Sequence, residues 1–269
     1  MRSIELNLLS LCPVNCSYCP QGALRKATNK PSTITPTAMD RIIDNVSNGT
    51  GHRVRVWLAG FTEPTSHPQF RERLQQLLGH HQVKDVHLFT TGSGLSREDV
   101  EYLRHPGIKT RHFHVRPPGD YGSMPGYKGH VWDWLPTLSS IGARFTCVGT
   151  GITPEQAQSM KEICATHDIP LKIGTPITRS ANVQVVEIGK YTLDVPCTCS
   201  RVKQDRRPVV MPNGDVYACC NDFGLELKLG NLLTQTWEDL DFESVHQLQS
   251  DPSSGALCFR DCHLAQPQK

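Results

Sequence analysis

The chain has 269 residues, which is enough for one large domain or for one domain with a small appendage. Its hydrophobic fraction of 38% and charged fraction of 20% are ordinary for a soluble globular protein. A formal net charge of +2 gives no strong electrostatic reason to expect a nucleic acid or membrane partner, and no apolar run approaches the ~20 residues that a membrane helix needs.

Eleven cysteines are many for a chain of this size. In a secreted protein they would suggest disulfides, but the N-terminal residues carry an acid, Glu5, and enter a strand at once, which is unlike a signal peptide. We therefore expect a cytoplasmic protein whose thiols bind metal and which is sensitive to oxygen.

Strand and helix signals alternate along the first two-thirds of the chain. The predicted strands are residues 3–8, 53–59, 85–90, 109–115, 144–148 and 170–175. The predicted helices are residues 37–46, 69–78, a segment capped by Ser96, residues 132–141 and residues 154 to about 167. Six strand–helix steps predict an α/β fold with a parallel sheet and right-handed crossovers. Eight would close a TIM barrel, in which the loops at the carboxyl ends of the strands carry the site.

The alternation stops after about residue 182. Two β-rich runs, 209–211 and 216–218, flank Asn213-Gly214 and predict a hairpin, and short helices are expected near Trp237 and over 244–249. We expect a first domain over residues 1–185 and a small cysteine-rich domain over residues 186–269. Because this tail has little apolar core, metal is expected to hold it together. Its cysteines are Cys197, Cys199, Cys219, Cys220, Cys258 and Cys262.

Residues 12–19, which we call the cysteine loop, follow the first predicted strand. They place Cys12, Cys16 and Cys19 at the spacing Cys-x3-Cys-x2-Cys. Three thiolates on a short loop can bind three irons of a cubane iron–sulfur cluster and leave the fourth iron open for chemistry. The alternatives are a zinc knuckle, which usually shows paired Cys or His ligands, and a set of disulfides.

With Tyr18 before its last cysteine, the cysteine loop resembles that of the radical S-adenosylmethionine (SAM) superfamily. The resemblance implies an open, partial (β/α)6 TIM barrel whose [4Fe–4S] cluster binds the amino and carboxylate groups of SAM. It implies that an electron from an external flavodoxin- or ferredoxin-type reductant cleaves SAM to methionine and a 5′-deoxyadenosyl radical. This radical takes a hydrogen atom from the substrate. Tyr18 stands where the family has an aromatic residue near the adenine, and packing of the loop is its alternative role.

The segment Gly60-Phe-Thr-Glu63-Pro64 follows the second predicted strand, in the place of the family's Gly-Gly-Glu-Pro motif. Glu63 would accept a hydrogen bond from the ammonium group of SAM, and a plain strand-end turn is the alternative. Thr91 stands in the place of the asparagine of the family's Thr-Asn-Gly loop, which would shape the floor of the site, although a simple glycine turn fits as well. Arg179 follows the sixth predicted strand, in a segment that resembles the Ser-Arg-Ala-Gly stretch of family members with a cysteine-rich tail. An arginine there would contact a carboxylate or phosphate of SAM or substrate, and a solvated side chain is the alternative.

Residues 116–130, after the fourth predicted strand, are long, aromatic and rich in glycine. Loops of this length in compact domains tend to be functional or disordered. We interpret this loop as a substrate loop or lid.

The tail resembles the Twitch domain, the short form of the SPASM auxiliary-cluster domain, although its last pair is Cys-x3-Cys where the family has Cys-x2-Cys. The resemblance implies a second [4Fe–4S] cluster, which we assign to Cys199, Cys219, Cys258 and Cys262, with structural zinc as the alternative. A spare thiol can also donate a hydrogen atom to a substrate radical. The candidates for that role are Cys147, Cys197 and Cys220, whereas Cys164 is expected in the core.

The resulting functional hypothesis is a radical SAM oxidoreductase that dehydrogenates a small metabolite. The alternatives are an epimerase or isomerase acting on a small molecule or a modified nucleoside, a peptide-modifying enzyme, and a non-catalytic iron–sulfur or zinc-binding protein. A small-molecule substrate is favoured, and no membrane partner is expected.

Overall fold

The computed structural model describes residues 1–17, 19–28, 30–48, 51–120, 122, 124–149, 151–174, 195–199, 207–254 and 265–267, and for 197–199 and 265–267 it describes the backbone alone. The predictions for Tyr18, Arg179, Cys258 and Cys262 concern residues outside these ranges.

Six parallel strands form the centre of the fold, in the order in which they occur along the chain. They are β1 (Arg2–Leu6), β2 (Val54–Leu58), β3 (Val83–Thr90), β4 (Ile108–His114), β5 (Arg144–Val148) and β6 (Leu171–Gly174). The helices between them are α1 (Gln21–Ala27), α2 (Pro36–Ser47), α3 (Phe70–Gly79), α4 (Arg97–Tyr102), α5 (Leu135–Ser140) and α6 (Pro154–Thr166). The predicted α/β fold is confirmed, and the sheet with its helices corresponds to an open, partial TIM barrel.

Helix α1 was not predicted. It has only seven residues, and its N-cap residue, Pro20, makes no side-chain capping bond. The usual start signal of a helix is therefore missing from the sequence.

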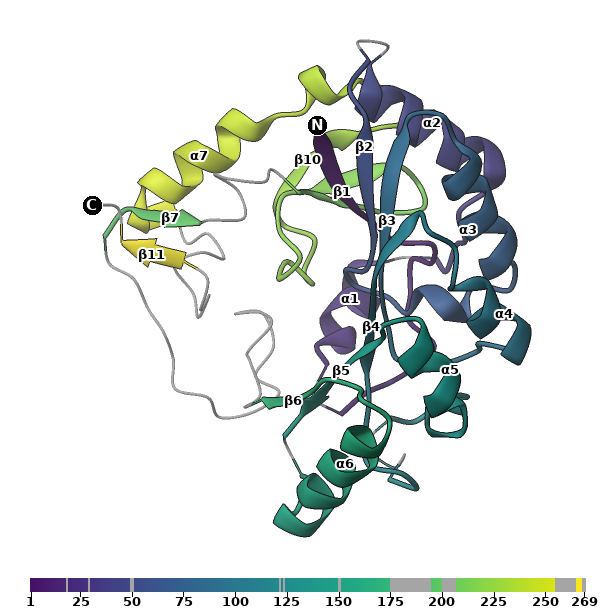
Figure 1. Ribbon diagram of the computed structural model, residues 1–269. Coiled ribbons are helices and arrows are strands. Elements are labelled where there is room, and N and C mark those ends of the chain that lie inside the picture. Colours follow the sequence, from purple (N-terminus) through teal and green to yellow (C-terminus); the bar gives the residue numbers. More distant parts are fainter. Residues whose placement is uncertain are drawn as a thin grey trace.

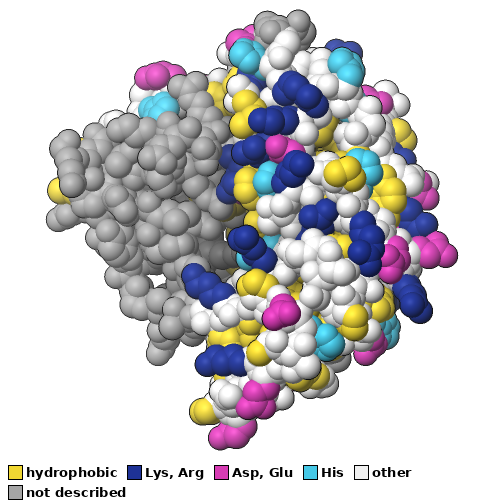
Figure 2. All heavy atoms as spheres, in the orientation of Figure 1, with side chains coloured by type: hydrophobic (Ala, Val, Ile, Leu, Met, Phe, Trp, Pro, Cys, Tyr) yellow, Lys and Arg dark blue, Asp and Glu magenta, His cyan; other side chains and the backbone are white. Residues whose placement is uncertain are grey.

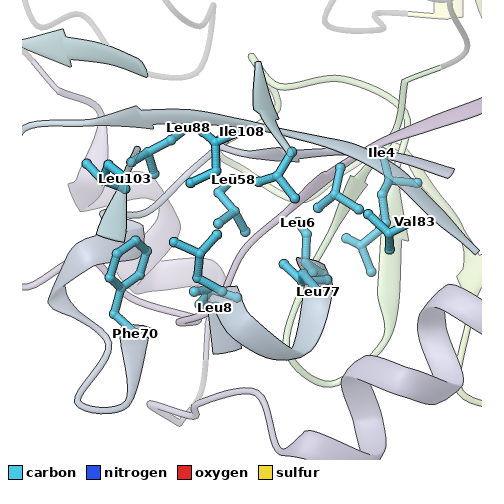
Figure 3. Close-up of a cluster of buried hydrophobic side chains, with 14 of the residues drawn as sticks. Ile4, Leu6, Leu8, Leu58, Phe70, Leu77, Val83, Leu88, Leu103 and Ile108 are labelled. Carbon is cyan, nitrogen blue, oxygen red and sulfur yellow. The ribbon is translucent and has the colours of Figure 1, made fainter. Parts of the chain in front are cut away.

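Side chains that alternate along the strands produce a hydrophobic core on one face of the sheet. In β2, for example, Val54, Val56 and Leu58 are fully buried. Helices α2 to α5 cover this face (Figure 1). Figure 3 shows the centre of the core, where side chains of β1 to β4 meet those of α3, such as Leu77.

The opposite, concave face of the sheet carries a row of stacked rings. The rings of Trp57 and His87 stack at 4.1 Å, those of Phe89 and His112 at 4.9 Å, and those of His112 and His114 at 5.1 Å. Burial is the main cause that lowers the pKa of His87 and of His112. Both imidazoles are therefore neutral near pH 7, which suits stacking against uncharged rings.

The tail extends the same sheet. Strands β8 (Val209–Val210), β9 (Asp215–Tyr217) and β10 (Lys228–Asn231) are antiparallel neighbours, which confirms the predicted hairpin. Strand β8 also pairs in parallel with β1, so the whole sheet has nine strands in the order β10-β9-β8-β1-β2-β3-β4-β5-β6.

The remaining tail elements are short. Helix α7 (Phe242–Ser250) and the 3₁₀ helix η4 (Trp237–Asp239) confirm the two expected helices. A separate two-stranded sheet joins β7 (Cys197–Cys199) to β11 (Ala265–Pro267). In Figure 1 this small sheet and α7 lie across from the concave face, on the side away from α2 to α5.

Among the described residues, the exposed large hydrophobic side chains are Met1, Val195 and Leu248. Figure 2 accordingly shows hydrophobic side chains scattered over the described surface, with Lys and Arg side chains in a band down its middle. No helix in this part of the chain is both long and apolar enough to span a membrane.

Candidate functional site

The cysteine loop lies at the carboxyl end of β1, with Cys12 buried and Cys16 and Cys19 half-buried. Cys12 is 8% exposed and packs with Val14 and Met124, and Cys16 contacts the same small hydrophobic cluster. The Cys19 N–H donates to the Cys16 carbonyl at 3.0 Å, and Arg25 donates to the Cys12 carbonyl at 3.0 Å. The loop is therefore held by its backbone and by a cation from α1.

Burial, and after it the charge of Glu63, raises the pKa of the Cys12 thiol well above its usual range. A thiolate at this position consequently needs positive charge, which a metal centre supplies. Within the described residues, no three His, Cys, Asp or Glu side chains are grouped so as to hold a single metal ion. A cubane binds each thiolate through a different iron, and one short loop here carries three thiols, of which that of Cys12 is buried and those of Cys16 and Cys19 are half-buried.

The loop of residues 116–130 covers the cysteine loop. The Asn15 N–H donates to the Pro125 carbonyl at 2.8 Å, and the side chain of Met124 is buried among Cys12 and Val14. Gly126 has a φ of +84°, and a Cβ there would lie 2.5 Å from the Pro13 carbonyl oxygen. Residues 124–126 therefore contact the cysteine loop, which the interpretation of residues 116–130 as a substrate loop did not foresee.

Glu63 joins the carboxyl ends of β2 and β3. It is 4% exposed. Its Oε1 accepts from the Thr65 N–H at 3.1 Å and from the hydroxyls of Thr65 and Thr90, and its Oε2 accepts from the Thr91 N–H at 2.6 Å and the Thr91 hydroxyl at 2.7 Å. Pro64 then begins the 3₁₀ helix η1 (Pro64–Ser66). Glu63 thus fixes the position of Thr91, and its expected contact with an ammonium group stays a prediction.

Asn7 is a site residue that the sequence analysis missed. Its Oδ1 accepts from the N–H groups of Phe61 and Thr62 at 2.9 and 3.1 Å and from the Thr62 hydroxyl at 3.0 Å. Its Nδ2 donates to the Val210 carbonyl at 3.3 Å. Gly60 has a φ of +104°, and a Cβ there would lie 2.9 Å from Asn7 Nδ2, so glycine is needed for this approach. The sequence signal that could have indicated this role is a polar amide, that of Asn7, between two apolar residues, Leu6 and Leu8.

Gln21, the first residue of α1, was also missed. Its side chain lies between the cysteine loop and the 60–64 segment, 2.5 Å from the Phe61 carbonyl oxygen and 3.8 Å from Cys19 Sγ. Its Oε1 is buried without a hydrogen-bond partner among the residues that the structure describes. An acceptor without a partner beside Cys19, a predicted cluster ligand, fits a site that receives a group with N–H donors.

The tail contributes the turn that contains Cys219 and Cys220. Cys219 is 5% exposed, and its Sγ accepts from the Asn221 N–H at 3.3 Å. An N–H donor two residues after a cysteine stabilises a thiolate, as a cluster ligand requires. The Phe223 ring packs on Phe61 at 4.9 Å, and Cys19 and Cys220 border the same hydrophobic cluster. The structure therefore brings the tail turn beside the cysteine loop.

The remaining cysteines are placed differently. Cys147 is fully buried in the core between the sheet and its helices, where burial raises its pKa to about 11. Cys164 is 1% exposed in the same core, which confirms its expected structural role. The backbones of Cys197 and Cys199 form β7, and their side chains lie outside the described residues.

Comparison with known proteins gives matches to two families. Residues 6–119 match the radical SAM superfamily, and residues 199–263 match the SPASM iron–sulfur cluster-binding domain. No curated protein matches the chain.

Several solved structures share the fold at low sequence identity. SuiB of Streptococcus suis, bound to its precursor peptide SuiA, has a TM-score of 0.68 at 13% identity, over 97% of this chain and 72% of SuiB. The anSMEcpe structure with bound AdoMet (SAM) has a TM-score of 0.64 at 14% identity, over 93% of this chain and 81% of that one. BtrN in complex with AdoMet and 2-DOIA has a TM-score of 0.60 at 14% identity, over 94% of this chain and 88% of BtrN.

Proposed function

Because the chain belongs to the radical SAM superfamily and carries a SPASM iron–sulfur domain, we propose that it is an oxidoreductase that dehydrogenates an alcohol or amine carbon of a small metabolite. Its cofactors are SAM with a [4Fe–4S] cluster, and an auxiliary cluster in the tail. We assign the first cluster to Cys12, Cys16 and Cys19. With SAM bound, this centre supplies one-electron cleavage of SAM and thereby abstraction of a hydrogen atom from the substrate.

The Cys219 turn is the observation that carries the oxidative outcome. Its buried thiol has an N–H donor, and the turn packs through Phe223 onto Phe61, beside the cysteine loop. We assign the auxiliary cluster to Cys219 with Cys199, Cys258 and Cys262. Four thiolates saturate a cubane, so this cluster can accept an electron but has no iron left for substrate. A substrate radical beside a hydroxyl or amine would lose a proton to solvent and an electron to this acceptor, and a carbonyl or imine would result.

Epimerisation is the competing outcome, because a thiol near the site could return a hydrogen atom. Cys220 is the partly exposed candidate beside the same hydrophobic cluster as Cys19. The core position of Cys147 separates its thiol from the concave face, so we give it no role in the proposal. A peptide substrate, as in the SuiB complex, is a further alternative.

The experiment is anaerobic turnover in deuterium oxide with SAM, dithionite and a panel of small alcohols and amines that includes 2-DOIA. We expect 5′-deoxyadenosine together with a product that has lost two hydrogen atoms and carries no deuterium on carbon. A product that instead gains one deuterium, with this gain lost in Cys220→Ala, would refute oxidation in favour of epimerisation.

A further inference from the structure

We propose that Gln21 is a positioning residue of the SAM-binding centre: its side-chain amide donates a hydrogen bond to the Cys19 thiolate and thereby raises the reduction potential of the cluster. The proposal concerns the first cluster alone and does not depend on which reaction the enzyme carries out.

The orientation of the amide follows from its neighbour. Gln21 Nε2 lies 2.5 Å from the Phe61 carbonyl oxygen, which can only accept a hydrogen bond. The atom facing this carbonyl must therefore be the amide nitrogen and not Oε1. Since an amide nitrogen carries two protons, the second is available to Cys19 Sγ, 3.8 Å from the same nitrogen.

The local fold explains how this contact arises. Helix α1 begins two residues after Cys19, and its first side chain returns toward the thiol. Gln21 is only 1% exposed, so water does not compete for its amide. The Phe61 ring is held in turn by Phe223. Gln21 thus fixes Cys19 against the 60–64 segment from a rigid position.

The electrostatic effect has a definite sign. The reduced cluster carries one more negative charge than the oxidised cluster, and an N–H donor to a ligating sulfur stabilises the more negative state. Removal of the donor should therefore make the cluster harder to reduce. Because solvent exposure of the cluster also affects its potential, the test needs one variant that keeps the volume of Gln21 and one that keeps its N–H donor.

The test uses anaerobically purified enzyme and three variants. Gln21→Met keeps the volume and removes the donor, Gln21→Glu replaces it with a negative charge, and Gln21→His keeps an N–H donor. Gln76→Met is the matched control, because Gln76 bonds to Pro36 and Asp40, away from the cysteine loop. The readouts are iron content and a redox titration of the paramagnetic signal that responds to added SAM.

We expect Gln21→Met to retain its iron and to show, at the wild-type midpoint, an at least threefold lower ratio of reduced to oxidised cluster. That ratio corresponds to a midpoint about 30 mV more negative, since a tenfold ratio equals ~59 mV for one electron. Gln21→Glu should shift further in the same direction, and Gln21→His should stay nearer the wild type.

The proposal is overturned if Gln21→Met keeps its iron and titrates like the wild type and Gln76→Met. If Gln21→Met loses the cluster, retention in Gln21→His supports the donor role. Equal loss from both variants overturns it, because a residue that only packs would lose the cluster whether or not a donor remained.

Discussion

Residues 124–126 lie on the cysteine loop, and we call them its cover. Gly126→Ala should displace this cover from the cysteine loop. The Cβ of alanine would lie 2.5 Å from the Pro13 carbonyl oxygen, a backbone atom that cannot move aside without moving the loop. The φ of +84° adds about 1–2 kcal/mol for a residue with a side chain. Withdrawal of the loop breaks the bond from the Asn15 N–H to the Pro125 carbonyl, which opposes withdrawal by about 0.5–1.5 kcal/mol in the variant and in the wild type alike.

The backbone strain therefore shifts the balance toward the withdrawn loop by about 1–2 kcal/mol, and the collision with Pro13 adds to this shift. The population of the withdrawn state rises roughly tenfold for each ~1.4 kcal/mol. Withdrawal uncovers Cys12 and Cys16, which pack with Met124 while the loop is in place. Iron release to a chelator under anaerobic conditions should therefore gain a fast phase of about four irons, the content of one cubane, at a rate at least roughly five to thirty times that of the wild type.

Gly119→Ala is the matched control. Gly119 lies in the same loop with a φ of +79°, but a Cβ there would meet nothing within 4 Å. This variant has the backbone strain without the collision. If Gly126→Ala releases iron no faster than Gly119→Ala, contact with Pro13 does not keep the cover in place, and the reasoning is wrong.

Three further predictions concern the thiols of the cysteine loop, the hydrogen bonds of Asn7 and the buried histidines His87 and His112. The triple alanine variant of the cysteine loop should form no 5′-deoxyadenosine but keep about four irons in the tail, whereas an iron-free variant that binds zinc would favour a structural zinc site. Asn7→Ala leaves buried N–H groups without their acceptor and should lower the free energy of unfolding by about 2–4 kcal/mol in urea. Asn45→Ala, which loses one bond to the Leu232 carbonyl, should cost about 1 kcal/mol, and equal losses would contradict the role of Asn7. Because burial lowers the folded-state pKa values of His87 and His112, the unfolded chain takes up protons first as the pH falls below about 6.5. Stability should be fully present above that pH and fall below it by up to about 1.4 kcal/mol per pH unit for each histidine, and a His112→Gln variant with the wild-type slope would refute this.

The repeating pattern of the first two-thirds of the chain was sufficient to predict its fold. Alternation such as Val54, Val56 and Leu58 in β2 is a local signal, and the core confirms it residue by residue. The spacing of the cysteine loop likewise indicated the radical SAM superfamily, whose model matches residues 6–119. Local patterns carry this information because each element buries its own apolar face.

The contacts that organise the site could not be predicted in this way. Asn7 bonds to Phe61, 54 residues away, and to Val210, 203 residues away. Periodicity says nothing about pairings over such separations, so the parallel pairing of β8 with β1 was also missed. For the loop of residues 116–130, composition indicated a functional loop, but only the structure shows that it contacts Pro13 and Asn15.

These long-range contacts make the tail part of the predicted SAM-binding region. Asn7 holds Phe61 and Thr62 with one end of its amide and Val210 of β8 with the other. Phe223, from the turn after Cys220, packs on the same Phe61. A displacement of the tail hairpin therefore acts on the 60–64 segment through two independent contacts. Since Gln21 connects Phe61 to Cys19, a short series of packed and hydrogen-bonded groups joins the turn of Cys219 to Cys19, a predicted ligand of the first cluster.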